Sequence, residues 1–126
     1  WLMLQQAKPD DYVIATGEQK SIKDFIQMTA CELGWRKNND SLPIEWQGEG
    51  LDEVGIRKDT NQIVIRVDKR YFRPSEVDSL LGDPSKAKNK LGWKPKITLE
   101  ELIQEMIEND KKQVLKELNT NKNNYL

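Results

Sequence analysis

Histidine is absent from the 126 residues, and cysteine occurs once, at Cys31. These two shortages remove the usual zinc ligand sets, the Ser-His and Cys-His nucleophile pairs and the commonest general base of enzymes. A single cysteine cannot form an internal disulfide, and the apolar, helical neighbourhood of Cys31 suits a small buried thiol in a reducing compartment, which we expect to be the cytoplasm. Any chemistry would have to use tyrosine, lysine or carboxylates.

Glycine-rich phosphate loops are also missing. The sequence contains no G-x-G-x-x-G or G-x-x-G-x-x-G, and the "GEG" at Gly48 to Gly50 has no third glycine and opens no helix. Neither Tyr12 nor Tyr71 is followed four residues later by lysine, so a Tyr-x-x-x-Lys acid/base pair is missing. Adjacent acidic residues lack the alternating spacing of a calcium loop. We therefore expect no catalytic, cofactor-binding or metal-binding residue in this chain.

Charge of one sign and long apolar runs are lacking too. Twenty basic residues stand against 21 acidic ones, so the chain has no overall positive field for binding nucleic acid. No apolar run approaches the roughly 18 residues of a membrane helix, so we expect no membrane span. The sequence begins at Trp1 without an initiator methionine or a signal peptide, and we expect it to be cut from something longer.

What the sequence does contain is a set of short helical and strand patterns. Three helices are predicted: residues 21–33 with Ser21 as N-cap and Gly34 as C-cap, a short one from Asp83 to Gly92, and a long one that begins at Thr98. The weaker predictions are a helix end at 1–6, a β-rich run at 11–17, a short strand at 44–46, an irregular loop at 48–61, a strand at 62–68 and a short helix at 73–82. The sum is mixed α/β with short strands, of the kind that more often edge a larger fold. The predicted domain is 1–118, with 119–126 as a frayed tail.

One cluster has the chemistry of a nucleotide site. Tyr71, Arg73 and Glu76 follow a predicted strand and flank a proline. Arginine offers a planar fork of donors that matches phosphate, glutamate can accept two hydrogen bonds from a ribose diol, and tyrosine adds a flat face and a hydroxyl. The alternative is a surface ion pair between Arg73 and Glu76 with Tyr71 packed beside it, which composition alone leaves open.

Two aromatic groups allow a functional and a structural interpretation. Trp93, among the lysines between Lys86 and Lys96, fits either a patch for single-stranded nucleic acid or a solvated helix face with an anchoring tryptophan. Trp35 and Trp46 could stack a sugar or a base, or could pack in the core. We expect the structural interpretation in both cases.

Several segments, taken in order, closely resemble the C-terminal portion of the GDP-mannose 4,6-dehydratase family. They are "DDYVIATGE", "SIKDFIQMTACELG", "EWQGEGLDEVGI", "VDKRYFRPSEVDSLLGDPSKAKNKLGWKP" and "TLEELIQEMIENDKK". The "DPSKAKNKLGWKP" ending resembles many nucleotide-sugar epimerases and dehydratases, whereas "RYFRPSEVD" points to the GDP-mannose member. The chain departs from the family at Lys69, where proline is expected, and in a longer "RKNNDSLP" linker.

The resemblance implies a fold and a division of labour. The fold class is α/β: a small mixed helix and short-strand C-terminal substrate-binding subdomain of an extended short-chain dehydrogenase/reductase, without its Rossmann domain. In the family, the Rossmann domain binds NADP and carries the catalytic residues, and the intact enzyme forms homo-oligomers. The resemblance implies that Arg73 contacts the diphosphate of GDP-mannose, that Glu76 contacts the guanosine ribose, and that Tyr71 lines the nucleotide pocket.

The family's reaction converts GDP-mannose to GDP-4-dehydro-6-deoxymannose, so this chain alone is expected to be inactive. Two alternatives stay open. The chain could be the C-terminal part of another nucleotide-sugar epimerase or dehydratase. It could also be a stand-alone module that binds another protein through the apolar surface a missing domain would cover.

Overall fold

The chain forms two compact units in a computed structural model that describes residues 1–36, 41–73, 75 and 79–123. The first unit comprises Trp1–Ser21 and Pro74–Thr98, and the second comprises Ile22–Arg73 and Leu99–Leu126. The second unit contains the strands and the two longer helices. The first contains one short α-helix and extended segments.

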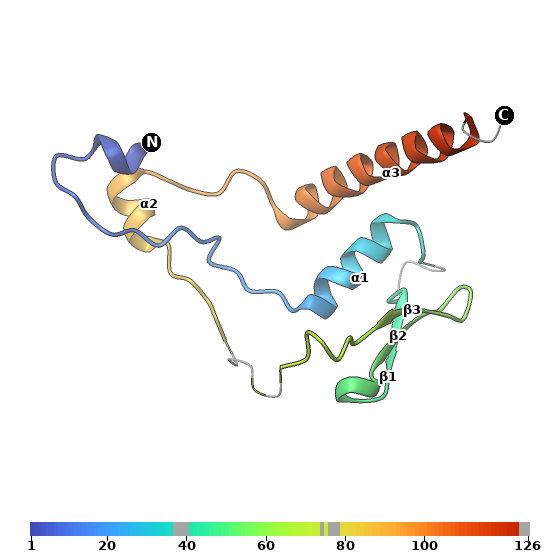
Figure 1. Cartoon of the computed structure of the whole chain (residues 1–126). Helices are drawn as coiled ribbons and strands as arrows, with labels where there is room; N and C mark the ends of the chain where they lie inside the picture. The colour runs from blue at the N-terminus through green and yellow to red at the C-terminus, as the bar shows by residue number, and fades with distance from the viewer. Residues whose placement is uncertain (37–40, 74, 76–78, 124–126) are drawn as a thin grey trace. The chain divides into compact units, whose positions relative to one another are not determined.

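The second unit is built on a three-stranded antiparallel sheet in the order β1-β2-β3 (Figure 1). The strands are β1 (Ile44–Gln47), β2 (Val54–Arg57) and β3 (Gln62–Arg66), and a 3-10 turn, η2 (Gly50–Asp52), lies between the first two. The predictions for β1 and β3 are confirmed. The prediction of an irregular loop over 48–61 is wrong, because β2 lies within it and joins the short strands into one sheet.

Gly55 explains why the sequence pattern did not predict β2. A Cβ atom at this position would lie 2.9 Å from Cδ1 of Ile65 on β3 and 3.2 Å from Cγ2 of Ile44 on β1. The pairing register also shifts between Gly55 and Ile56. Glycine is a weak strand former on its own, so the pattern favours a loop, but here it permits close approach of a neighbour on each side.

Two helices complete the second unit. α1 (Ile22–Glu32) begins directly after Ser21, and α3 (Leu99–Asn123) begins directly after Thr98, as the capping residues predict. Figure 1 shows α1 beside the strands, and α1 contacts both β1 and α3. The buried apolar side chains where these elements meet are Ala30, Ile44, Ile103 and Ile107. α3 continues to Asn123, into the range 119–126 that was predicted as a tail.

Gln27 joins α1 to the sheet through two hydrogen bonds. Its side-chain Nε2 donates to the carbonyl oxygen of Ile44 at 2.7 Å, and the N–H of Ile44 donates to its Oε1 at 3.0 Å. Gln27 is 8% exposed, and Ile44 is 2% exposed. The amide thus takes the place of a neighbouring strand at the outer edge of β1, where unpaired backbone groups would be costly.

The first unit contains η1, a 3-10 helix (Leu2–Gln5), and α2 (Ser85–Leu91). α2 confirms the short helix predicted from Asp83 to Gly92: the Asp83 carboxylate accepts the N–H of Ser85 at 2.9 Å, and Gly92 ends the helix with a φ of 64°. The helix end predicted for 1–6 is present as a single 3-10 turn. Ala87 of α2 is fully buried.

Two further predictions, a β-rich run at 11–17 and a helix at 73–82, are wrong over the described residues. Residues 11–17 form no strand, and residues 73, 75 and 79–82 form no helix, while the rest of the predicted 73–82 helix lies outside the described residues. A Cβ on Gly82 would lie 2.7 Å from Cβ of Ala15 and 3.3 Å from Cγ1 of Val13. The backbone of Gly82 therefore lies close against the side chains of Val13 and Ala15, a tertiary interaction that neither local pattern contains.

None of the helices that the structure describes combines the length and the apolar character needed to cross a membrane.

Candidate functional site

A tight turn follows β3 and leads into the segment predicted to bind a nucleotide. The N–H of Tyr71 donates to the carbonyl oxygen of Asp68 at 3.0 Å, and the N–H of Arg70 donates to the Asp68 carboxylate at 2.9 Å. The guanidinium of Arg70 also contacts this carboxylate, with Nη2 2.6 Å from Oδ2 and Nε 3.2 Å from Oδ1. These hydrogen bonds from Arg70 lower the pKa of the Asp68 carboxyl. Asp68 therefore stays ionised and holds both the backbone and the side chain of Arg70.

Tyr71 projects from this turn into solvent. It is 76% exposed, and the guanidinium carbon of Arg70 lies 5.4 Å from the centre of its ring. The sequence pattern identified Tyr71 but missed Asp68, which accepts the N–H of Tyr71, and Arg70, which lies beside its ring. The signal was present as an acid and an arginine two residues apart directly after a strand. An exposed aromatic on an ordered turn can stack on a flat ligand.

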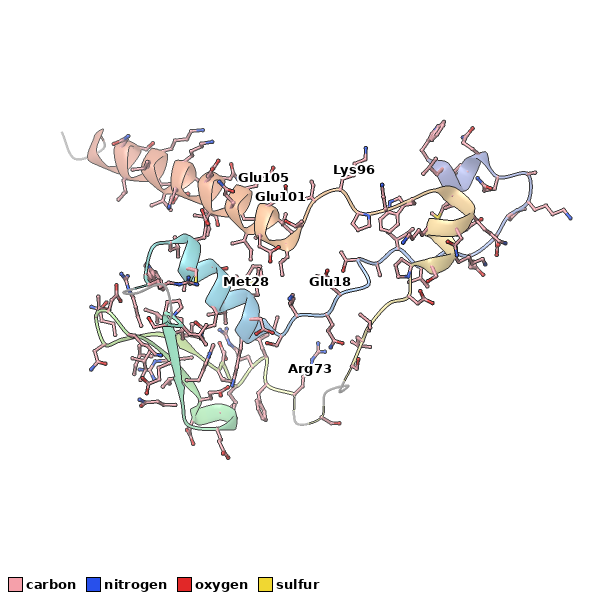
Figure 2. The ribbon with its side chains drawn as sticks, turned by 180° about the vertical axis from the view of Figure 1, so that it is seen from behind. Glu18, Met28, Arg73, Lys96, Glu101 and Glu105 are labelled. Carbon is pink, nitrogen blue, oxygen red and sulfur yellow. The ribbon has the colours of Figure 1, made fainter. Side chains whose placement is uncertain are left out.

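Arg73 is exposed and lies on the segment that follows β3, two residues beyond Tyr71 (Figure 2). Arg73 ends the Ile22–Arg73 stretch of the second unit. Glu76 lies outside the described residues, so the predicted grouping of Arg73 with Glu76 stays a prediction. Tyr71 and Arg73 share one short, exposed, basic piece of chain.

The lysines near Trp93 take part in contacts within the first unit. Asp10 accepts from Nζ of Lys86 at 2.5 Å and from Nζ of Lys90 at 3.1 Å, and Lys86 also lies 5.3 Å from the ring centre of Tyr12. Trp93 lines a small hollow with side chains of η1. These contacts favour the structural interpretation of the patch, in which two lysines fix the 10–12 segment on α2.

Trp35 and Trp46 each receive a cation from the second unit itself. The guanidinium carbon of Arg57 lies 4.2 Å from the ring centre of Trp35, and Nζ of Lys23 lies 5.0 Å from that of Trp46. Trp35 also lines an apolar cavity of about 200 Å³ between α1 and β3. Because this cavity is walled almost wholly by apolar side chains, it does not suit a charged nucleotide. The packing interpretation of both tryptophans is favoured.

The described residues do not have the arrangement of a dinucleotide-binding site. A dinucleotide site uses a glycine-rich turn between a parallel strand and a helix, whereas the sheet here is antiparallel and the sequence has no such turn. Among the described residues, no three acidic or cysteine side chains gather to form a metal site. The chemistry that the described residues offer is binding: an exposed aromatic ring and basic side chains after β3.

Comparison with known proteins assigns the family. The sequence model of the family described as "GDP-mannose 4,6 dehydratase" matches residues 1–106. The chain is 46% identical over 123 residues to GDP-mannose 4,6-dehydratase of Yersinia enterocolitica, covering 90% of this chain and 31% of that protein. It is 46% identical over 110 residues to GDP-mannose 4,6 dehydratase 2 of Caenorhabditis elegans, covering 87% of this chain and 27% of that protein. It is 44% identical over 110 residues to GDP-mannose 4,6 dehydratase of Homo sapiens, covering 87% and 28%.

These matches place the chain in a family of enzymes, the dehydratases of nucleotide sugars. The chain belongs to the GDP-mannose 4,6-dehydratase family. It spans about 30% of the length of these relatives and corresponds to their C-terminal portion. The resemblance inferred from sequence and the small mixed α/β fold class are thereby confirmed.

Proposed function

We propose that this chain is the part of a GDP-mannose 4,6-dehydratase that binds the nucleotide sugar. The complete enzyme would convert GDP-mannose to GDP-4-dehydro-6-deoxymannose with NADP, as a lyase that removes water. The observation that carries the proposal is the identity of 44–46% to dehydratases across most of this chain. The names of these relatives supply the substrate, and the basic turn after β3 supplies a surface of suitable chemistry.

In this proposal, Arg73 contacts the diphosphate, Glu76 contacts the guanosine ribose, and Tyr71 lines the nucleotide pocket. Local charge supports the first role. Residues 66–73 contain four basic side chains against one acidic side chain, a local charge of +3 in a chain whose net charge is -1. A basic, exposed segment directly after a strand attracts a diphosphate and can bind it through the bidentate geometry of arginine.

This chain would bind and orient the nucleotide, and the reaction would take place on residues of another part of the enzyme. NADP, where bound, would supply hydride transfer, and in this proposal its site lies on another part of the enzyme. The proposed contribution of this chain to the rate is therefore positional. The proposal retains the predicted partners, a Rossmann domain of the same enzyme and further copies in an oligomer, and the predicted cytoplasmic location, which suits the free thiol of Cys31.

The direct test is a titration of this chain with GDP, UDP and dTDP in which the NMR shifts of the backbone amides report binding. We expect GDP to bind most tightly and to shift the amides of residues 68–73. The test variant is Arg73→Gln. Its matched control is Lys116→Gln, which removes the same charge from the exposed far half of α3. Loss of GDP binding in the first variant alone supports the proposal; equal binding of all three nucleotides would overturn the choice of GDP.

A second test separates binding from turnover. GDP-mannose is offered to this chain alone and to the chain joined to the N-terminal portion of the Yersinia relative. We expect product in the second case alone. Turnover by the isolated chain would contradict the division of labour.

A second candidate function, a stand-alone interaction module, is favoured by the exposed apolar side chains in the far half of α3, where Val114, Leu115 and Leu118 are 52–59% exposed. Sedimentation of the chain with and without GDP tests it. Self-association that GDP does not change would favour the module, because a protein-binding face would act without the nucleotide.

A further inference from the structure

Several hydrogen bonds to Asp68 join the residues of the turn after β3. The Asp68 carboxylate accepts from the backbone N–H of Arg70 and, through both oxygens, from the Arg70 guanidinium, while the Asp68 carbonyl oxygen accepts from the N–H of Tyr71. Asp68 therefore restrains both Arg70 and Tyr71. All three lie in the second unit, directly after a strand of the sheet.

This order contributes little to folding. The side chain of Arg70 is 77% exposed and that of Asp68 is 42% exposed, and ion pairs at such exposure add little stability. Tyr71 is 76% exposed, so it contributes little buried apolar area. The main physical effect of the hydrogen bonds is local: they limit the positions that Arg70 and Tyr71 can adopt.

The limited freedom of Tyr71 has a use if its ring receives a ligand. An aromatic ring that is already placed loses less conformational entropy when a flat group stacks on it. The Arg70 guanidinium, 5.4 Å from the ring centre, adds a cation to the same stack. The surrounding basic side chains of residues 66–73 favour a ligand that joins a flat ring to negative charge.

We propose that Asp68 and Arg70 are positioning residues, which hold the ring of Tyr71 ready to stack on the base of a nucleoside diphosphate; this inference rests on the proposed function. Arg73 would contact the phosphates, and the Asp68–Arg70 pair would act through Tyr71 on the base. The pair thus determines how well the base is held, separately from the attraction of the phosphates.

The variant Asp68→Asn tests this inference through the sign of its effect. Removing a negative charge from a basic segment strengthens the attraction of any phosphate, so affinity for inorganic pyrophosphate should rise. Loss of the ionised carboxylate also frees Arg70 and Tyr71, so affinity for GDP should fall, by about fivefold. Opposite changes for the two probes support the inference. A rise for both would overturn it, because charge alone would then account for the turn.

Arg70→Gln with Arg66→Gln as its matched control is the second measurement. Each variant removes one positive charge from the segment, and they should weaken pyrophosphate binding equally. Arg70→Gln should weaken GDP binding about tenfold and Arg66→Gln less than about threefold. In a Tyr71→Ala background this excess should vanish, because Arg70 acts through the ring. An excess that persists without Tyr71 would overturn the inference.

The outcomes also separate this inference from the proposed function. If the unaltered chain binds neither GDP nor pyrophosphate, the proposed function fails and the inference fails with it. If the unaltered chain binds GDP and Asp68→Asn binds it as tightly or more tightly, the inference alone fails.

Discussion

The two compact units of this chain are stabilised in different ways. The second unit buries four apolar side chains from three elements, Ala30 of α1, Ile44 of β1, and Ile103 and Ile107 of α3, and its sheet pairs three strands. In the described part of the first unit, Ala87 is the one buried apolar side chain, and two lysines of α2 hold the 10–12 segment through Asp10. The second unit thus depends mainly on packing, and the first depends more on ion pairs and close contacts between extended segments.

This difference matches the roles proposed for the chain. The turn that carries Tyr71 follows β3, so it is anchored on the unit with the packed core. A binding residue is more precisely placed on a rigid element than on a segment with few buried contacts. We therefore expect the second unit to be the more stable of the two and the first unit to be the easier to unfold. The following variants test that expectation.

Gln27→Leu should have the largest effect, and in the second unit. It removes both partners of the buried Ile44 backbone, and each unsatisfied group costs roughly 1–3 kcal/mol, so the free energy of unfolding should fall by about 3 kcal/mol. Urea unfolding followed through Trp35 and Trp46, with Trp1 and Trp93 replaced by phenylalanine, reports this unit.

Gln27→Glu is the control for that variant. The carboxylate can still accept from the N–H of Ile44 but cannot donate to its carbonyl oxygen, so the loss should be smaller at acidic pH, where the protonated acid can donate. A Gln27→Leu protein as stable as the parent would show that the amide is not a substitute for a strand.

Gly55→Ala should come next, also in the second unit. The added Cβ would lie 2.9 Å from Cδ1 of Ile65, closer than carbon atoms pack, and overpacking of this kind costs about 1–3 kcal/mol. Ile65→Val removes that Cδ1 atom and should restore part of the stability in the double variant. If Gly55→Ala unfolds at the parent's urea concentration, the strands do not need the glycine.

Gly82→Ala is the equivalent change in the first unit. Its Cβ would lie 2.7 Å from Cβ of Ala15, and this contact is between short side chains that cannot turn aside. We expect a local loss of about 1–2 kcal/mol, seen as faster amide exchange in α2 with little change in the sheet. Ala15→Gly should relieve it. Equal destabilisation of both units would contradict the distinction between them.

The helices could be predicted from sequence because their signals are local. Ser21, Gly34, Thr98 and Gly92 mark helix ends, and each lies within one or two residues of an observed end. β2 could not be predicted, because glycine is a weak strand former by itself. Gly55 suits a strand here only because side chains of β1 and β3 approach it closely from the two sides. Residues 11–17 have a strand's composition, but Val13 and Ala15 pack against Gly82, which lies 69 and 67 residues away in sequence.

The candidate site was predicted in part for the same reason. The chemistry of Tyr71 and Arg73 is visible in the residue types, and the structure places both on an exposed segment after a strand. Asp68 and Arg70 were missed although their spacing is local, because an acid and an arginine near each other are common on surfaces. The pairing of Asp10 with Lys86 was beyond prediction, since 76 residues separate them and no pattern links the two.

The smallest expected effect concerns pH, and it again distinguishes the units. Hydrogen bonds from Lys86 and then Lys90 lower the pKa of Asp10 from 3.8 to about 2, and the same contact raises the pKa of Lys86. A lowered carboxyl pKa stabilises the folded state above the unfolded value, and that contribution is lost as pH falls from about 3.8 toward 2. The raised pKa of Lys86 has the opposite sign, so its contribution holds below 10.5 and is lost only as pH rises past that value.

The protection factors of the α2 amides, which are the intrinsic exchange rates at each pH divided by the measured rates, should therefore fall between pH 4 and pH 2. Asp10→Asn should already show the lower protection factors at neutral pH. The neighbouring carboxyl provides the control, because Asp11→Asn removes the same charge one residue away and leaves the contacts of Asp10 with both lysines in place. If Asp10→Asn and Asp11→Asn behaved alike, net charge rather than the Asp10 contacts would stabilise the first unit, and the contrast with the packed second unit would have to be explained without this ion pair.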